Sequence, residues 1–161
     1  MNARLFLAGL LAIGACSPKS SENASSDSSF AKLQQRGGTV MGVDQYTSEH
    51  VFEPLPDGGR IVLQRKEPDS AGELAIREHM YTIAKAFAAG DFTLPGVVHA
   101  MKDVPGTAEM RELRNDITYT AQDLPRGGEV VISTTNPRAV TAIHDFLAFQ
   151  RMDHRAGAHM K

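Results

Sequence analysis

The stretch LPDGGRIVL at residues 55–63 recurs in related form as LPRGGEVVI at residues 124–132. Each copy combines a proline and a glycine pair, which favour a tight turn, with apolar residues that favour a strand. Each copy is followed by a proline, Pro68 or Pro137, and then by apolar residues at helical spacing. Because turn, strand, proline and helix follow in the same order twice, the sequence predicts an internal duplication.

The two predicted units cover residues 48–89 and 117–156, and each contains two strands followed by a helix. In the first unit, one apolar stripe at helical spacing consists of Ile76, Met80, Ile83 and Phe87. In the second unit, Asn136 and Pro137 are typical of the start of a helix. We therefore predict an α+β fold: a four-stranded antiparallel sheet from two ββα repeat units, with the helices packed on one face.

Two segments have no counterpart in this scheme. Residues 90–105 follow the first unit and predict a long irregular loop that carries His99. Loops of this length in a compact domain often have a function. Upstream of the first unit, residues 40–43 predict a short strand.

The N-terminal residues are typical of a secretory signal peptide. Arg4 precedes an apolar run at residues 5–13, and small residues follow that run. The run is too short to cross a bilayer, which requires about 20 helical residues. We therefore predict that residues 1–15 form a signal peptide that is removed.

The motif IGAC at residues 13–16 resembles the lipobox of bacterial lipoproteins. This resemblance implies cleavage before Cys16 and attachment of lipid, including palmitate, to that residue. Ser17 stands where an inner-membrane lipoprotein would carry a retention aspartate, so we expect anchoring in the outer membrane, facing the periplasm. The alternative is an ordinary cleaved signal with a free thiol at Cys16.

The rest of the chain divides into a tether and one domain. Residues 17–29 include seven serines and no large apolar side chain, which predicts a flexible tether after the lipidated cysteine, together residues 16–29. Residues 30–161 form the predicted single globular domain. The formal net charge of -2 gives no electrostatic case for nucleic acid binding, and the single cysteine excludes an internal disulfide.

No catalytic motif is recognisable in this sequence. It contains neither a phosphate-binding P-loop nor the serine elbow of the α/β-hydrolases. We therefore predict a non-enzymatic binding domain without a cofactor. Its expected partners are the lipid bilayer, through the acylated Cys16, and an unknown protein or small ligand.

The histidines provide the alternative, which is a copper or zinc site. In the repeat, His50 aligns with Tyr119 on the core-facing side of a strand, and His79 aligns with Phe146 on a helix. Both should therefore point inward from neighbouring elements, and His99 in the long loop is the natural third candidate. The predicted metal ligands are His50, His79 and His99.

Two other interpretations of the histidines remain open. They are structural side chains, or His99 takes part in acid–base chemistry, which would need a carboxylate beside it in a closed pocket. The neighbours Asp153 and His154 are not predicted to form a functional pair, because adjacent residues of a helix point about 100° apart.

From Met41 onward the chain resembles a family of small bacterial envelope proteins without an agreed function. The resemblance lies in the motifs MGVDQ at 41–45, DGG at 57–59, GDF at 90–92, VPGT at 104–107 and AIHDFL at 142–147. Some of these relatives carry the label aspartate carbamoyltransferase. That enzyme has a Ser-Thr-Arg-Thr phosphate loop, whereas STTN at residues 133–136 lacks the arginine, so we predict no such activity.

Overall fold

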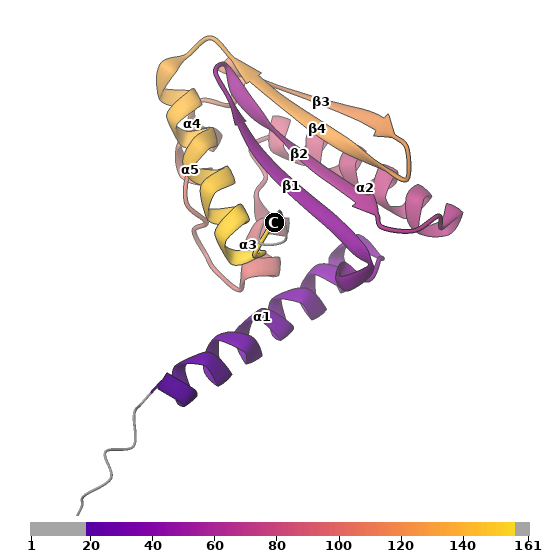
Figure 1. Cartoon of the computed structure of the whole chain (residues 1–161). Coiled ribbons are helices and arrows are strands. Elements are labelled where there is room, and N and C mark those ends of the chain that lie inside the picture. Colours follow the sequence, from indigo (N-terminus) through magenta and orange to yellow (C-terminus); the bar gives the residue numbers. More distant parts are fainter. Residues whose placement is uncertain (1–18, 157–161) are drawn as a thin grey trace, which may run out of the picture.

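The structure, a computed structural model, describes residues 19–156 (Figure 1). The described chain contains five α-helices, two short 3₁₀ helices and four strands. In chain order these are α1 (Lys19–Met41), η1 (Gln45–Thr47), β1 (Ser48–Leu55), β2 (Gly58–Arg65), α2 (Ser70–Ala88), α3 (Thr93–His99), α4 (Thr107–Glu112), η2 (Arg114–Asp116), β3 (Ile117–Leu124), β4 (Gly127–Thr134) and α5 (Pro137–Asp153).

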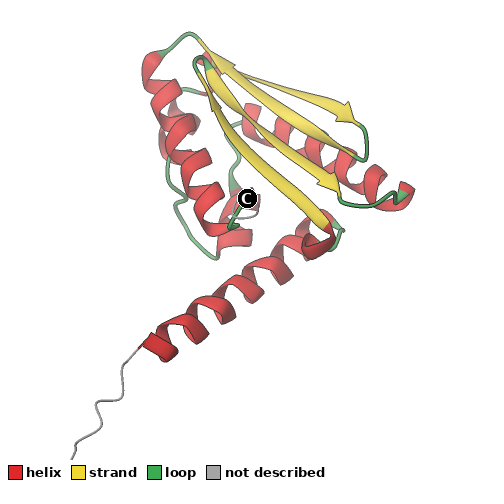
Figure 2. Ribbon diagram, in the orientation of Figure 1, coloured by secondary structure: helices red, strands yellow, loops and turns green. Residues whose placement is uncertain are grey.

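The four strands form one antiparallel sheet in the order β1-β2-β4-β3, which confirms the predicted α+β fold (Figure 2). β1 and β2 form the hairpin of the first unit, and β3 and β4 form that of the second. Where the inner strands pair, Ile61 lies opposite Val130, and these residues occupy equivalent positions in the repeat. The two units are therefore related by a pseudo-twofold axis that passes between these two residues.

The helices α2 and α5 pack on the same face of the sheet, as predicted. Each covers the hairpin of the other unit: α2 lies mainly on β3 and β4, and α5 on β1 and β2. The second glycine of each turn permits this approach. A Cβ atom at Gly59 would lie 2.2 Å from Leu147 Cδ1, and one at Gly128 would lie 3.3 Å from Met80 Cγ. The second glycine of each pair therefore serves helix packing in addition to the turn.

A pair of polar contacts repeats the same symmetry. The Arg77 guanidinium on α2 donates to the carbonyl oxygen of Leu124 at 2.9 Å. At the equivalent position on α5, His144 Nε2 lies 2.9 Å from the carbonyl oxygen of Leu55, so this nitrogen must carry a proton. Two different side chains thus satisfy equivalent carbonyl groups, which supports an origin by duplication.

The expectation of a flexible tether is wrong from Lys19 onward, because residues 19–29 belong to α1. Serine has only moderate helix propensity, but tertiary contacts override propensity. Arg155 at the end of the domain pairs with Asp27 at 3.0 Å, and its guanidinium lies 4.3 Å from the centre of the Phe30 ring. Further along the same helix, Leu33 is buried in the domain. Residues 17 and 18 lie outside the described part of the chain.

Two local predictions are also corrected. Residues 40 and 41 end α1 and residues 42 and 43 follow it, so the predicted strand at 40–43 does not form. The predicted irregular segment 90–105 contains the helix α3. The Pro95 and Gly96 pair conceals this short helix from sequence reasoning, whereas burial of Phe92 and Val98 holds it against the domain.

Candidate functional site

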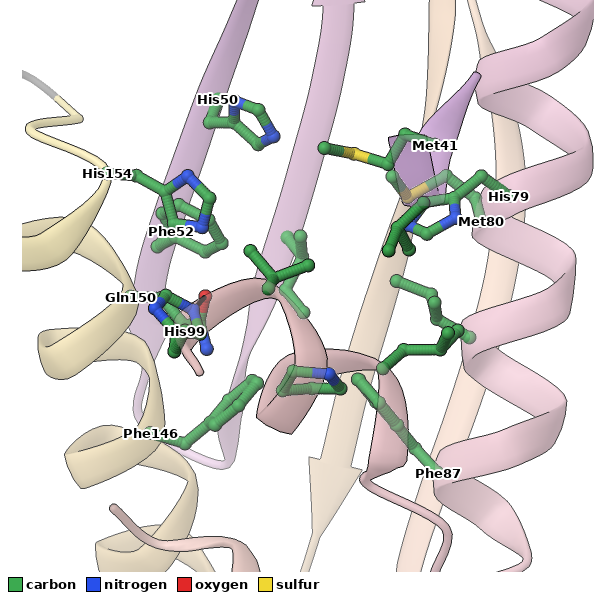
Figure 3. A pocket seen from close by; sticks show the side chains of 16 residues that line it. Met41, His50, Phe52, His79, Met80, Phe87, His99, Phe146, Gln150 and His154 are labelled. Carbon is green, nitrogen blue, oxygen red and sulfur yellow. Dashed lines mark hydrogen bonds between the residues drawn. The ribbon is translucent and has the colours of Figure 1, made fainter. Parts of the chain in front are cut away.

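A pocket of about 70 Å³ lies between the sheet, the inner sides of α2 and α5, and the ends of α1 and α3. Most of its wall is apolar. Its side chains with metal-binding atoms are four imidazoles and two thioethers, from His50, His79, His99, His154, Met41 and Met80. We call it the histidine pocket (Figure 3). Its volume suits an ion or a group of a few atoms, because pockets for drug-sized ligands typically measure about 300–1,000 Å³.

All three histidines that the sequence singles out line this pocket. His50 projects from β1, His79 projects from α2, and His99 is the last residue of α3. The inward orientation predicted for His50 and His79 from the repeat is therefore confirmed. Their role as metal ligands remains a prediction.

The fourth imidazole, that of His154, was missed by sequence reasoning. His154 lies at the C-terminal cap of α5, and its ring centre is 4.9 Å from that of His50 and 5.1 Å from that of His99. A signal for it was present, because His154 aligns with Phe87 when the helices of the two units are superposed in sequence. The angle between adjacent residues of one helix does not reveal this equivalence.

The repeat gives these positions a meaning. In the other half of the core, the Phe87 ring lies 5.9 Å from that of Tyr119 and 5.9 Å from that of Phe146, and it also stacks on Phe92 at 4.7 Å. We call Phe87, Tyr119 and Phe146 the aromatic cluster. The pseudo-twofold axis relates these three positions, in the same order, to His154, His50 and His79. Three positions of the core thus carry aromatic rings while their equivalents carry imidazoles, and two of the aromatic rings, those of Phe87 and Phe146, line the histidine pocket as well.

The imidazoles opposite the aromatic cluster are neutral at physiological pH. Burial and, to a smaller extent, the nearby His79 together lower the pKa of His50 to about 4. Burial alone lowers the pKa of His79 to about 4. The pKa of His154 is lowered to about 3, first by burial and then by His50 and His99. Each ring therefore keeps a nitrogen lone pair that can bind a metal ion.

Two thioethers also line the pocket, on the side opposite His50 and His154. Figure 3 shows His50 and His154 on one side, and His79 with Met41 and Met80 on the other. Met80 is only 2% exposed and Met41 only 8%. The Met41 sulfur accepts a weak hydrogen bond from the Gln45 amide at 3.8 Å. The pocket thus brings nitrogen and sulfur donors from α1, α2, β1 and α5 together.

His99 differs from the other three, because both of its ring nitrogens are engaged. Nδ1 lies 2.5 Å from Asp153 Oδ2, and Nε2 lies 2.8 Å from Gln150 Oε1. The carboxylate that acid–base chemistry at His99 would need is therefore present. The described wall of the histidine pocket, however, contains no serine, threonine, cysteine or acidic side chain that could act as a nucleophile.

The histidines of the pocket do not form a preformed site in which three or more of them could bind one metal ion. Among the described residues, no three His, Cys, Asp or Glu side chains are arranged around one point as ligands of a metal ion. A metal site in the present side-chain arrangement would therefore contain at most two imidazoles, and any further ligand would have to be of another kind.

Comparison with protein-family models, curated proteins and solved structures finds no match to this chain. The resemblance to small envelope proteins and the lipobox at Cys16, which lies outside the described residues, therefore remain predictions. None of the helices within residues 19–156 has the length and apolar character needed to cross a bilayer.

Proposed function

We propose that this protein is a lipid-anchored protein of the bacterial cell envelope that binds Cu(I) in the histidine pocket. The observation that carries the proposal is that three positions of the core carry imidazoles, whereas the positions equivalent to them in the repeat carry aromatic residues. The proposed ligands are drawn from His50, His79 and His154, with a thioether from Met41 or Met80.

Packing alone does not explain three imidazoles at these positions. In the other half, Phe87 and Phe146 fill two of the three equivalent positions with apolar rings, whereas a buried polar group without a hydrogen bond costs stability. The third position holds Tyr119, whose hydroxyl is also buried without a partner. His154 Nδ1 is buried without a hydrogen-bond partner, whereas His50 and His79 are half-buried at the pocket wall. Metal coordination would use the lone pair of His154 that is left without a partner.

The donor set and the charge of the pocket favour Cu(I) over Zn(II). Thioethers select the soft Cu(I) ion, and imidazole binds it as well. Structural zinc sites need four ligands, chiefly thiolate and imidazole, and no such group is arranged among the described residues. The described pocket wall also lacks a carboxylate, so a cation there would keep its full charge. Because desolvation cost grows with the square of the charge, a monovalent ion is favoured.

Titration of the full chain with Cu(I) tests this function. The detergent-solubilised protein is mixed with a coloured Cu(I) chelator complex under reducing conditions, and loss of colour reports transfer of the ion. We expect one Cu(I) per chain with a Kd below about 1 µM, and weaker binding of Zn(II). A Kd above that value would contradict the proposal.

Two control variants sharpen the titration. His144→Gln removes a histidine that lies outside the pocket and should leave Cu(I) binding unchanged. His159 and Met160 lie outside the described residues, so the variant His159→Ala/Met160→Ala separates binding by the C-terminal residues from binding in the pocket. If this double variant alone abolishes binding, the ion is held by those residues.

The lipid anchor is tested separately at Cys16. The Cys16→Ser variant should lose metabolic labelling with palmitate and should move from the membrane fraction to the soluble fraction. The reason is that acyl chains on one cysteine supply the hydrophobic free energy that holds the protein in the bilayer. Unchanged labelling and fractionation would refute the anchor while leaving the copper site in place.

A further inference from the structure

His99 lies in the wall between two cavities. One is the histidine pocket, and the other is a polar cleft of about 250 Å³ between α1, α3 and the end of α5, lined in part by Met152 and Asp153. The two arginines of the cleft have partners: Arg36 donates to the carbonyl oxygen of Val98, and Arg155 pairs with Asp27. Of the residues named for these cavities, His99 alone belongs to both.

We propose that His99, together with Met152, forms a second, transient Cu(I) position through which the ion passes from the polar cleft into the histidine pocket. This inference rests on the proposed function. It adds a route and two donors to the copper site, and it gives Asp153 a role as a positioning residue.

The metal-binding side chains form a series from the surface to the interior. The Met152 side chain is 70% exposed at the cleft, whereas His99 is only 8% exposed. From His99 the next ring centre, that of His154, is 5.1 Å away, and His50 lies a further 4.9 Å on. Met152 and His99 line the same cleft, and His99 and His154 line the same pocket, so each donor shares a cavity with the next.

The hydrogen bonds of His99 suit a temporary ligand. Asp153 fixes the ring through Nδ1, an arrangement that orients metal-binding histidines. The other nitrogen, Nε2, contacts only the neutral amide of Gln150. That amide has a nitrogen without a hydrogen-bond partner, so exchanging its oxygen and nitrogen would let it donate to Nε2. A metal ion therefore has to displace one neutral hydrogen bond and no ion pair.

The transfer is a ligand exchange without redox chemistry. The Met152 sulfur releases Cu(I) as His99 Nε2 binds it, and His154 then replaces His99. The ion remains Cu(I) throughout. The proton on His99 Nδ1 stays in its hydrogen bond to Asp153, so no proton leaves at this step.

Stopped-flow transfer of Cu(I) from a coloured chelator complex to the full chain tests the route. In Asp153→Asn and in Met152→Leu we expect the rate of Cu(I) loading to fall by at least about 10-fold, a size typical of mutations next to metal ligands. The equilibrium Kd for Cu(I) should change by less than about 3-fold. Asp145→Asn, on the exposed side of α5, and Met101→Leu, at the end of α3, are matched controls that should load at the wild-type rate.

The outcomes separate this inference from the proposed function. Wild-type loading rates in both Asp153→Asn and Met152→Leu would overturn the route and leave the copper site intact. Equal losses of rate and affinity would also overturn it, because they would make His99 a ligand of the final site. Failure of the wild-type chain to bind Cu(I) would overturn both proposals. Because Met152 is exposed, its variant remains informative if Asp153→Asn does not fold.

Discussion

Replacing the three histidines by their aromatic counterparts in the repeat, through His50→Tyr, His79→Phe and His154→Phe, is expected to raise thermal stability and abolish Cu(I) binding. The new rings fill the pocket and remove three imidazoles whose burial is costly, as their lowered pKa values indicate. Cavity filling commonly adds about 1–2 kcal/mol, which corresponds to a rise in Tm of about 2–8 °C in a domain of this size.

The loss of copper affinity in this triple variant should be at least about 100-fold, because changes next to metal ligands already cost 10–100-fold. Chelator competition measures the affinity, and circular dichroism measures the Tm. Tyr119→His, made in the aromatic cluster, is the reciprocal control: it should lower the Tm and leave Cu(I) affinity unchanged. A triple variant that loses stability would mean that the histidines serve packing, and one that keeps its affinity would place the ligands elsewhere.

The repeat explains why so much of the fold was predictable. The LPxGG stretches determine where each hairpin turns, and the alternation of apolar residues after them determines which side chains face the core. Aligning the two units in sequence then makes His50 equivalent to Tyr119 and His79 equivalent to Phe146. Both were predicted to point inward, and both line the pocket.

The elements that sequence reasoning missed depend on contacts between distant residues. The first part of α1 has a composition typical of a tether, and its contacts with Arg155 come from the other end of the domain. The sequence alone relates His154 only to its neighbours on the same helix, and these do not indicate a site. Its contacts with His50 and His99 come from β1 and α3, and only the equivalence with Phe87 could have indicated them.

The same three histidines should make the metal-free protein sensitive to acid. In the unfolded chain their pKa lies near 6.5, whereas the folded-state pKa is about 4 for His50 and His79 and about 3 for His154. Between these values the unfolded chain binds protons that the folded chain excludes. The free energy of unfolding therefore falls as pH falls below about 6.5, and the loss ends only below the folded-state pKa values.

The free energy of unfolding should fall by up to about 1.4 kcal/mol per pH unit for each histidine. For the three histidines together, the slope near pH 5 should be about 4 kcal/mol per pH unit. Since domains are typically stable by about 5–15 kcal/mol, most of the stability should be lost between pH 6.5 and pH 4. Urea denaturation of metal-free protein from pH 7.5 to pH 4.5 measures this loss. The triple aromatic variant keeps the carboxylates and lacks these histidines, so its curve should be much flatter. Equal pH dependence in the two proteins would show that these imidazoles titrate alike in the folded and unfolded chains.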